Sequence, residues 1–138
     1  MNKPSIIKSI LEGNIKLSKF KKDKDIVLAV VKKRGFELKY ADKILKKNKK
    51  IVLAAVKQAG DALQFADVSL KKDKSIVLAA VNRYAHSLQY ADISLKKNKE
   101  IALAAIKKDR TALLWVDNSL KKWDSPDADK DLLKALGY

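Results

Sequence analysis

A strict 25-residue period constrains this chain more than any other feature. Residues 23–47, 48–72, 73–97 and 98–122 repeat one pattern without an insertion, and the third copy reads D-K-S-I-V-L-A-A-V-N-R-Y-A-H-S-L-Q-Y-A-D-I-S-L-K-K. A tandem period of this length is typical of an array in which each repeat packs only against its neighbours. Function is therefore expected on a repeated surface.

The first half of each repeat is predicted to be a helix. It opens with an Asp or Asn, a residue type whose side chain accepts from the free N–H groups of a first helical turn. These capping positions are Asp23, Asn48, Asp73 and Asn98. The apolar segment that follows covers nearly the whole helix circumference and leaves a narrow polar strip, Asp25 and Lys32 in the first copy. It is therefore expected to be an inner helix, packed on several sides.

A second helix is predicted after a turn at Gly35 or Gly60, where a left-handed C-terminal cap would suit glycine. Its apolar face is made by residues at i, i+3 and i+7 and would close a helical hairpin. The four sets are Leu38/Ala41/Leu45, Leu63/Ala66/Leu70, Leu88/Ala91/Leu95 and Leu113/Val116/Leu120.

Less regular segments flank the repeats and are expected to cover the open ends of the stack. Residues 1–22 form the predicted N-terminal cap and residues 123–138 the C-terminal cap, in which Ser125 and Pro126 suit a helix start and Gly137 a helix end. The predicted fold class is all-α, a short solenoid of tandem 25-residue two-helix repeats with helical caps at both ends. It would form a single helical-repeat domain over residues 1–138.

The motif D-K-x-I-V-L-A-A-V-K-x-x-G-x-x-L-x-Y-A-D, seen at 48–67 and 73–92, resembles the repeats of a family called domain of unknown function 4116. The resemblance covers residues 23–122. It implies a helical array and no reaction, and it provides no catalytic residues to transfer.

The formal net charge is +15, and only Arg34, Arg83 and Arg110 among the 31 basic residues are Arg. Proteins that recognise the base edges of nucleic acid favour the bidentate guanidinium of Arg. The excess of Lys over Arg therefore argues against base-specific recognition. The lysines form either a solvated surface or one that binds a polyanion without sequence preference. The candidate polyanion-binding residues lie on one predicted edge and are Lys46, Lys47, Lys49, Lys71, Lys72, Lys74, Lys96, Lys97 and Lys99.

A second candidate surface combines a ladder of aromatic residues with neighbouring positions that vary between copies. The rings could contact a partner, or they could pack between neighbouring second helices. The candidate partner-binding residues are Lys39, Tyr40, Lys43, Gln64, Phe65, Val68, Gln89, Tyr90, Ile93, Leu114 and Trp115.

Three further constellations have structural interpretations. The repeated acids Asp42, Asp67, Asp92 and Asp117 are too far apart to chelate one ion and are read as ion-pair partners or helix caps. The acidic cluster Asp124, Asp127, Asp129 and Asp131 lacks the turn Gly and final Glu of a calcium loop and suits a helix start. His86 is read as an exposed turn residue.

These patterns predict a non-enzymatic helical-repeat scaffold that binds a protein or peptide with acidic character. The alternative is sequence-nonspecific binding of nucleic acid or another polyanion through the Lys-rich edge. No cofactor, metal or membrane partner is expected. The lack of Cys and of an apolar leader-like start favours a cytoplasmic location.

Overall fold

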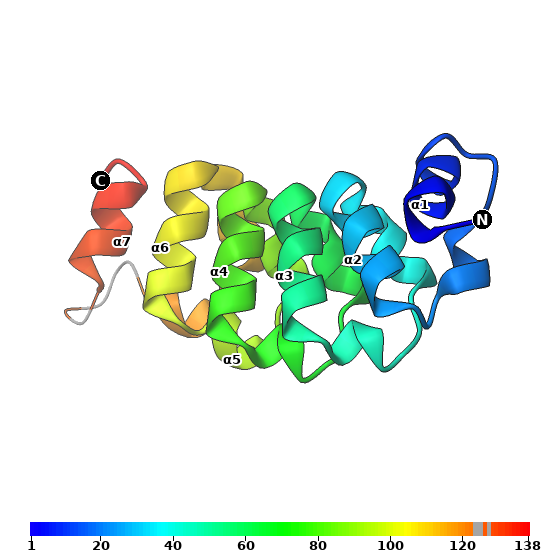
Figure 1. Ribbon diagram of the computed structural model, residues 1–138. Helices are drawn as coiled ribbons and strands as arrows, with labels where there is room; N and C mark the ends of the chain where they lie inside the picture. Colours follow the sequence, from blue (N-terminus) through cyan, green and yellow to red (C-terminus); the bar gives the residue numbers. More distant parts are fainter. Residues whose placement is uncertain (123–125, 127) are drawn as a thin grey trace.

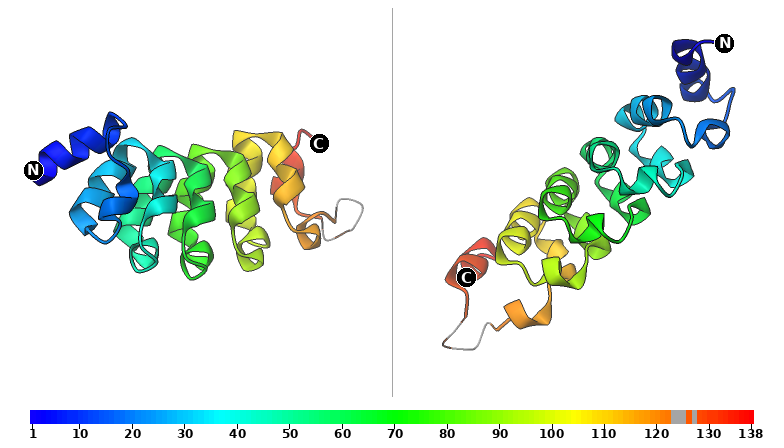
Figure 2. Two further views of the ribbon diagram at one scale, coloured as in Figure 1. Left: turned by 90° about the vertical axis from the view of Figure 1, so that its right-hand side faces the viewer. Right: turned by 60° about the horizontal axis from the view of Figure 1, so that its bottom comes forward.

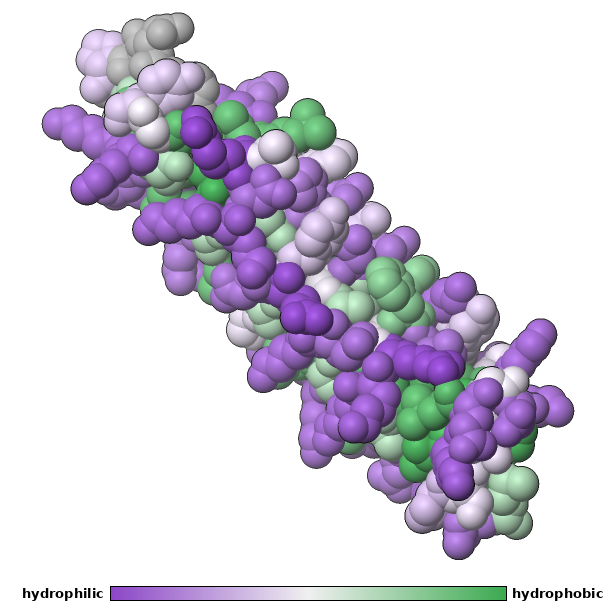
Figure 3. All heavy atoms as spheres, turned by 90° about the horizontal axis from the view of Figure 1, so that it is seen from above, coloured by the Kyte–Doolittle hydropathy of each residue, from purple (hydrophilic) through white to green (hydrophobic). Residues whose placement is uncertain are grey.

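The computed structural model describes residues 1–122, 126 and 128–138, and it is an elongated array with the two termini at opposite ends (Figure 1). Seen from above, hydrophilic residues cover most of its surface (Figure 3). The described residues contain helices and turns and no strand. Six α-helices of six to ten residues provide its main elements: α1 (Lys3–Leu11), α2 (Lys24–Lys33), α3 (Lys49–Gln58), α4 (Lys74–Arg83), α6 (Lys99–Lys108) and α7 (Lys130–Ala135). The predicted all-α repeat fold is confirmed.

Helices α2, α3, α4 and α6 stand side by side as one row, with one helix from each repeat (Figure 1). Each begins at the predicted capping residue. In α2 the Asp23 carboxylate accepts from the backbone N–H groups of Asp25 and Ile26, both at 3.0 Å, and in α3 the Asn48 side chain accepts from Ile51 at 3.1 Å. The capping prediction is confirmed.

The second half of each repeat forms a second row behind the α-helices (Figure 2, right). It is not one continuous helix, because an extended residue divides it in two. The first part is a six-residue 3-10 helix, at Gly35–Tyr40, Gly60–Phe65, Ala85–Tyr90 and Arg110–Trp115. The second part is a short helical turn of three or four residues. It is a 3-10 turn at Leu45–Lys47, Leu70–Lys72 and Asn118–Leu120, and an α-helical turn, α5, at Ile93–Lys96.

A backbone hydrogen bond between neighbouring repeats accounts for this division. Ala41 is extended, with ψ of 153°, and this geometry turns the next N–H group, that of Asp42, away from its own helix. That N–H donates instead to the carbonyl of Lys21, at 3.0 Å. The same bond recurs in every repeat, from Asp67 to Lys46, Asp92 to Lys71 and Asp117 to Lys96, at 2.9–3.0 Å. The second row is therefore joined through its backbone.

The prediction of left-handed glycine caps inside the repeats is wrong. Only Gly13 and Gly137, among the described residues, have positive φ, at 84° and 87°. Gly60 serves a different need, since a Cβ there would lie 2.5 Å from the carbonyl oxygen of Ala80 in the next repeat. Glycine is required at position 60 because the neighbouring α-helix approaches closely. A Cβ on Gly35 would clash with the carbonyl oxygen of Ala55 in the same way.

The core lies between the two rows and runs the length of the array. In α2 it is made by Ile26, Val27, Val30 and Val31, and Leu38 joins it from the second row. Equivalent residues of the later repeats are buried in the same way. At the ends, Leu17 of the N-terminal cap and Leu132 of α7 are fully buried, so the caps cover the stack as predicted.

Candidate functional site

One strip of each α-helix faces solvent, and it is wider and more apolar than the sequence analysis expected. In α2 it includes the exposed Asp25 and Lys32 and, between them, the half-buried Leu28 and Ala29. The four residues stand at i, i+3, i+4 and i+7, which places them on one helical face. The expectation of an inner helix covered on several sides is therefore wrong for this face.

A groove of about 580 Å³ lies on this face between α2 and α3 and extends to the end of α4. Leu28 from α2 and Leu53 and Ala54 from α3 provide its apolar lining. Its polar lining is Lys32, Lys50, Lys57, Gln58 and Arg83, so the groove has four cationic side chains and no carboxylate.

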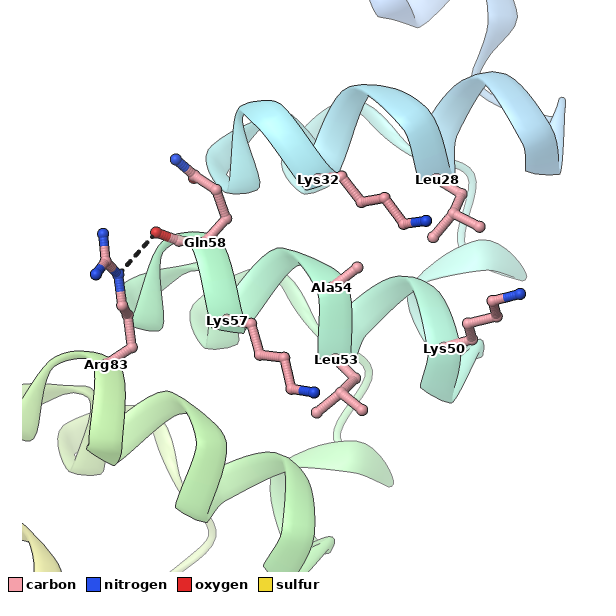
Figure 4. Close-up of a pocket in the computed structure, with 8 residues that line it drawn as sticks. All are labelled: Leu28, Lys32, Lys50, Leu53, Ala54, Lys57, Gln58 and Arg83. Carbon is pink, nitrogen blue, oxygen red and sulfur yellow. Dashed lines mark hydrogen bonds between the residues drawn. The ribbon is translucent and has the colours of Figure 1, made fainter.

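The cationic and apolar side chains of this groove are arranged in pairs (Figure 4). The Lys32 side chain runs toward Leu28 on the same helix, and Lys57 runs toward Leu53 in the same way. The aliphatic stem of a lysine can cover apolar surface while its ammonium group stays in water. Each pair therefore presents an apolar contact with a positive charge beside it.

A small hydrogen-bond network holds the end of the groove in place. The Arg83 Nε–H donates to the backbone carbonyl of Gln58 at 3.0 Å (Figure 4), and the Gln58 side-chain oxygen accepts from the N–H of Gly35 at 2.6 Å. These bonds join three successive repeats. Arg34 and Arg110 also donate to backbone carbonyls, of Leu11 and Leu136, so all three arginines satisfy carbonyls near helix ends.

A second hollow, of about 640 Å³, lies beside α6 near the C-terminal cap. Leu103 and Ala104 form its apolar part, and Lys99, Glu100 and Lys107 bring both charge signs. Lys99 is already paired with the carboxylates of the cap, Asp129 at 2.9 Å and Asp131 at 2.8 Å. These two acids hold the pKa of Lys99 above its usual value, with Asp131 the larger cause.

The predicted polyanion-binding lysines lie on one edge, where the short turns of the second row lead into the α-helices (Figure 1). Three of the nine are engaged with acids of the next repeat or of the C-terminal cap. Lys49 pairs with Asp73 at 2.9 Å, Lys74 pairs with Glu100, and Lys99 pairs with the C-terminal cap.

The remaining six edge lysines differ in exposure. Lys47, Lys72 and Lys97 are exposed, whereas Lys46, Lys71 and Lys96 are half-buried and their backbone carbonyls accept the inter-repeat hydrogen bonds. The carboxyl of Asp67 lies close to Lys47 and Lys71, and its pKa is lowered mainly by the Ser69 hydroxyl and to a lesser extent by these two lysines. Part of the positive charge is thus balanced within the edge.

The predicted partner-binding residues do not form one stripe, because the second helix on which they were placed is divided. Lys39, Gln64, Gln89 and Leu114 lie in the 3-10 helices, whereas Lys43, Val68 and Ile93 lie in or at the start of the short turns. Val68, Ile93 and Leu114 are 60–69% exposed, and Lys39 and Lys43 are also exposed.

The aromatic ladder packs mainly between repeats. Phe65, Tyr90 and Trp115 are half-buried against the core, and Phe65 contacts Phe36 edge to face at 6.2 Å between centroids. Tyr40, the first ring, is 44% exposed and has the Lys39 ammonium 4.7 Å from its centroid. The interpretation of packing between neighbours holds for Phe65 and Trp115, which contact Phe36 and His86 of the preceding repeats.

His86 is a link between repeats, so its interpretation as an exposed turn residue is wrong. The indole N–H of Trp115 donates to its Nδ1 at 3.0 Å, while Nε2 lies 2.8 Å from the Thr111 hydroxyl and 3.3 Å from Asp109. Because an indole N–H can only donate, Nδ1 is the acceptor and Nε2 carries the proton. Stacking on the Tyr84 ring, at 5.6 Å between ring centroids, and the hydrogen bond from Trp115 leave the His86 side chain only 22% exposed.

Two of the repeated acids, Asp92 and Asp117, cap the short helices that follow them, as one of the two interpretations had it, and Asp42 and Asp67 make the same kind of bond within a turn. Asp42 accepts from the N–H of Ile44 at 3.1 Å, and Asp67, Asp92 and Asp117 accept from a serine two residues later. In the tail, Asp129 caps α7 by accepting from the N–H groups of Asp131 and Leu132. Asp124, Asp127 and the predicted Ser125 cap lie outside the described residues.

The described part of the chain holds no cluster of three or more His, Asp or Glu side chains that could bind a metal ion. None of its helices is long and apolar enough to cross a membrane. The α-helical strip was the functional candidate that sequence reasoning missed. Its signal was present, because Leu28 and its equivalents lie between the two predicted polar positions of each helix.

The fold and its surfaces define a tandem helical-repeat protein. The chain belongs to the family described as domain of unknown function (DUF4116), which matches it twice, at residues 23–71 and 73–121. Each matched domain spans nearly two of the 25-residue repeats. No curated protein and no solved structure matches the chain.

Proposed function

We propose that this protein is a non-enzymatic binding scaffold for a protein or peptide segment with acidic character, and that the row of α-helices is its binding face. The observation that carries the proposal is the groove between α2 and α3. It combines an apolar lining with four cationic side chains and no acid. Such a surface matches a segment in which carboxylates flank an aliphatic residue.

The two components of the groove contribute differently to binding. Burial of one aliphatic side chain against Leu28, Leu53 and Ala54 contributes up to about 1.5–3 kcal/mol. The lysines steer an acidic partner toward the face and select against basic ones. Because the apolar lining repeats along the row, an extended partner can engage several repeats at once.

A second candidate function is nonspecific binding of nucleic acid or another polyanion along the Lys-rich edge. It is favoured by the exposed Lys47, Lys72 and Lys97, which recur at one position of successive repeats. It is weakened by the ion pairs of Lys49, Lys74 and Lys99, because a polyanion would have to compete with carboxylates already in place.

One binding comparison separates the two functions. The probes are a fluorescent peptide with alternating Glu and Leu and a single-stranded oligonucleotide, each titrated with the wild-type protein at two salt concentrations. The variants are Leu53→Ser on the groove and Lys47→Gln/Lys72→Gln on the edge. We expect peptide binding that is weakened by the groove variant and retained by the edge variant.

The opposite result would overturn the proposal. Oligonucleotide binding that is tighter than peptide binding, falls steeply with salt and depends on Lys47 and Lys72 would show the polyanion function instead. Leu53 is only half-buried, and a circular dichroism spectrum of each variant establishes that the array is intact.

A further inference from the structure

The short turns of the second row follow one another along an edge of the array and expose aliphatic side chains there (Figure 1). Val68 and Ile93 occupy the same position in the second and third repeats and are 68% and 60% exposed. In the first repeat that position is Lys43, and the next residue, Ile44, is 77% exposed. Three successive turns thus present an aliphatic side chain to solvent, and these three side chains are the aliphatic tips of the edge.

Lysines accompany the aliphatic tips. In α5, Ile93 is followed by Lys96 and Lys97 at i+3 and i+4, which places the three residues on one helical face. Val68 is followed by two lysines at the same spacing. Each of these tips therefore has positive charge beside it.

The edge keeps a net positive charge after its acids are counted. Eleven Lys and five Asp or Glu occur in residues 42–50, 67–75 and 92–100. The C-terminal cap adds two further acids, Asp129 and Asp131, which pair with Lys99. Because the lysines still outnumber the acids, the edge attracts an anionic surface.

The exposed groups of this edge fit a lipid surface better than a nucleic acid. Bases of a single strand stack on aromatic rings, whereas Phe65, Tyr90 and Trp115 are half-buried against the core. What the edge exposes beside its lysines is aliphatic. Neither hollow of the α-helical row includes the aliphatic tips, so a partner must supply the apolar surroundings in which they would be buried.

We infer that this edge binds the surface of an anionic lipid bilayer, with the aliphatic tips among the upper acyl chains and the lysines beside the headgroups. Interfacial binding of this kind combines buried apolar area with attraction of Lys to anionic lipids. It needs no membrane-spanning segment, and it departs from the sequence-based expectation of no membrane partner. The inference goes beyond the proposed function, since the groove between α2 and α3 contains none of the tips.

The test measures co-sedimentation of the protein with vesicles of phosphatidylcholine, with and without phosphatidylserine, at low and high salt. The tip variant is Val68→Ser/Ile93→Ser, and the charge variant is Lys72→Gln/Lys97→Gln. Leu114→Ser is the matched control, because Leu114 is 69% exposed on a 3-10 helix of the second row and is not one of the tips. All five positions are exposed, and circular dichroism checks that each variant keeps its helices.

We expect wild-type protein to bind the phosphatidylserine vesicles, to bind the neutral vesicles much less, and to lose binding as salt rises. The tip variant should weaken binding on the order of tenfold, because each buried methylene group contributes about fourfold. The charge variant should weaken it by a similar factor, and Leu114→Ser should leave it unchanged. Asn118→Ile, which gives the fourth turn the tip that it lacks, should tighten binding several-fold.

A fluorescent label checks which side of the array meets the lipid. The chain contains no Cys, so a single introduced Cys can carry an environment-sensitive dye. At Ile93→Cys the emission should shift to shorter wavelength when phosphatidylserine vesicles are added. At Lys57→Cys, on the solvent-facing strip of α3, it should not change.

Three results would overturn the inference. Wild-type protein that does not sediment with phosphatidylserine vesicles would refute the lipid surface. Vesicle binding that the tip variant does not weaken would show attraction by charge alone and no insertion of the tips. Tighter binding of a single-stranded oligonucleotide, equal in wild-type protein and the tip variant, would assign the edge to nucleic acid instead.

Discussion

The two rows of the array are held together in different ways. The α-helical row relies on side-chain packing, since successive α-helices contact one another and bury Ile, Val and Ala side chains. The second row relies on the backbone, since the N–H of each repeated Asp donates to a carbonyl of the preceding repeat. A backbone bond does not depend on side-chain identity, whereas close packing does.

This difference separates the positions that maintain the stack from those that can vary. On the α-helices, buried Ile, Val and Ala positions recur in every copy, while the exposed positions change from Lys to Ser, Asn or Glu. The row can therefore carry a changing charge pattern on an unchanged frame. Four predictions test the comparison.

The largest effect is expected where two α-helices touch. Ala80→Leu adds three carbon atoms at a fully buried position and should reduce the free energy of unfolding by about 1–3 kcal/mol through overpacking. Ala79→Leu, at the half-buried neighbouring position, is the matched control and should change it much less. Urea unfolding of both variants measures the difference, and equal losses would contradict the close-packing account.

Acid should remove a specific contribution at the start of α4. The Ser75 hydroxyl is the largest cause that lowers the pKa of Asp73, to about 2, with further lowering by Lys49 and by the Ile76 N–H. Because the folded pKa lies below the unfolded value, this carboxylate stabilises the fold above about pH 4, and the contribution is lost as the pH falls through 2.

The variant Asp73→Asn isolates that contribution, since Asn is the natural cap at the equivalent Asn48. It should flatten the fall in unfolding free energy between pH 4 and pH 2 by about 1–2 kcal/mol relative to wild type. Parallel curves for the two proteins would show that Asp73 has the same pKa in both states.

A side-chain hydrogen bond within the second row should have a smaller effect. Ser87 is fully buried and its hydroxyl donates to the Asp61 carboxylate of the preceding repeat at 3.0 Å. Ser87→Ala should lower the unfolding free energy by about 1 kcal/mol, the usual value of one hydrogen bond. Ser94→Ala, at an exposed turn, serves as the comparison, and thermal unfolding of both provides the measurement.

The smallest effect is expected on the solvent-facing strip. Lys57→Gln should change the unfolding free energy by less than about 0.5 kcal/mol, since exposed side chains away from caps and core contribute little. A substantial loss in chemical unfolding would mean that the strip supports the stack. The groove variants could then no longer be interpreted through binding alone.

Much of the fold could be predicted because it depends on local patterns. The caps at Asp23 and Asn48, the apolar helix after each of them, and the terminal helix ended by Gly137 follow from residue type and spacing alone. The division of the second helix at Ala41 could not be predicted. It depends on the N–H group of the next residue, Asp42, which donates to the carbonyl of Lys21, 21 residues earlier in the chain.

The candidate site shows the same limit. The sequence pattern identified lysines and aromatic residues as surface candidates, and it assigned Leu28 and Leu53 to the core with the other apolar residues of their helices. Which side of a helix remains uncovered depends on where the neighbouring helices lie, and a single helical wheel contains no such information. The groove with Lys32, Leu53 and Lys57 is therefore visible only in the assembled array.

The sequence by itself determined the repeat, its length, its helix starts and most of the residues that form the core, since hydrophobic periodicity and capping act within a few residues. The tertiary structure alone decided why Gly60 is needed, how His86 is bonded and which half-buried leucines face solvent. Each of these depends on contact between repeats, where atoms about 25 residues apart in the chain meet at van der Waals or hydrogen-bond distance.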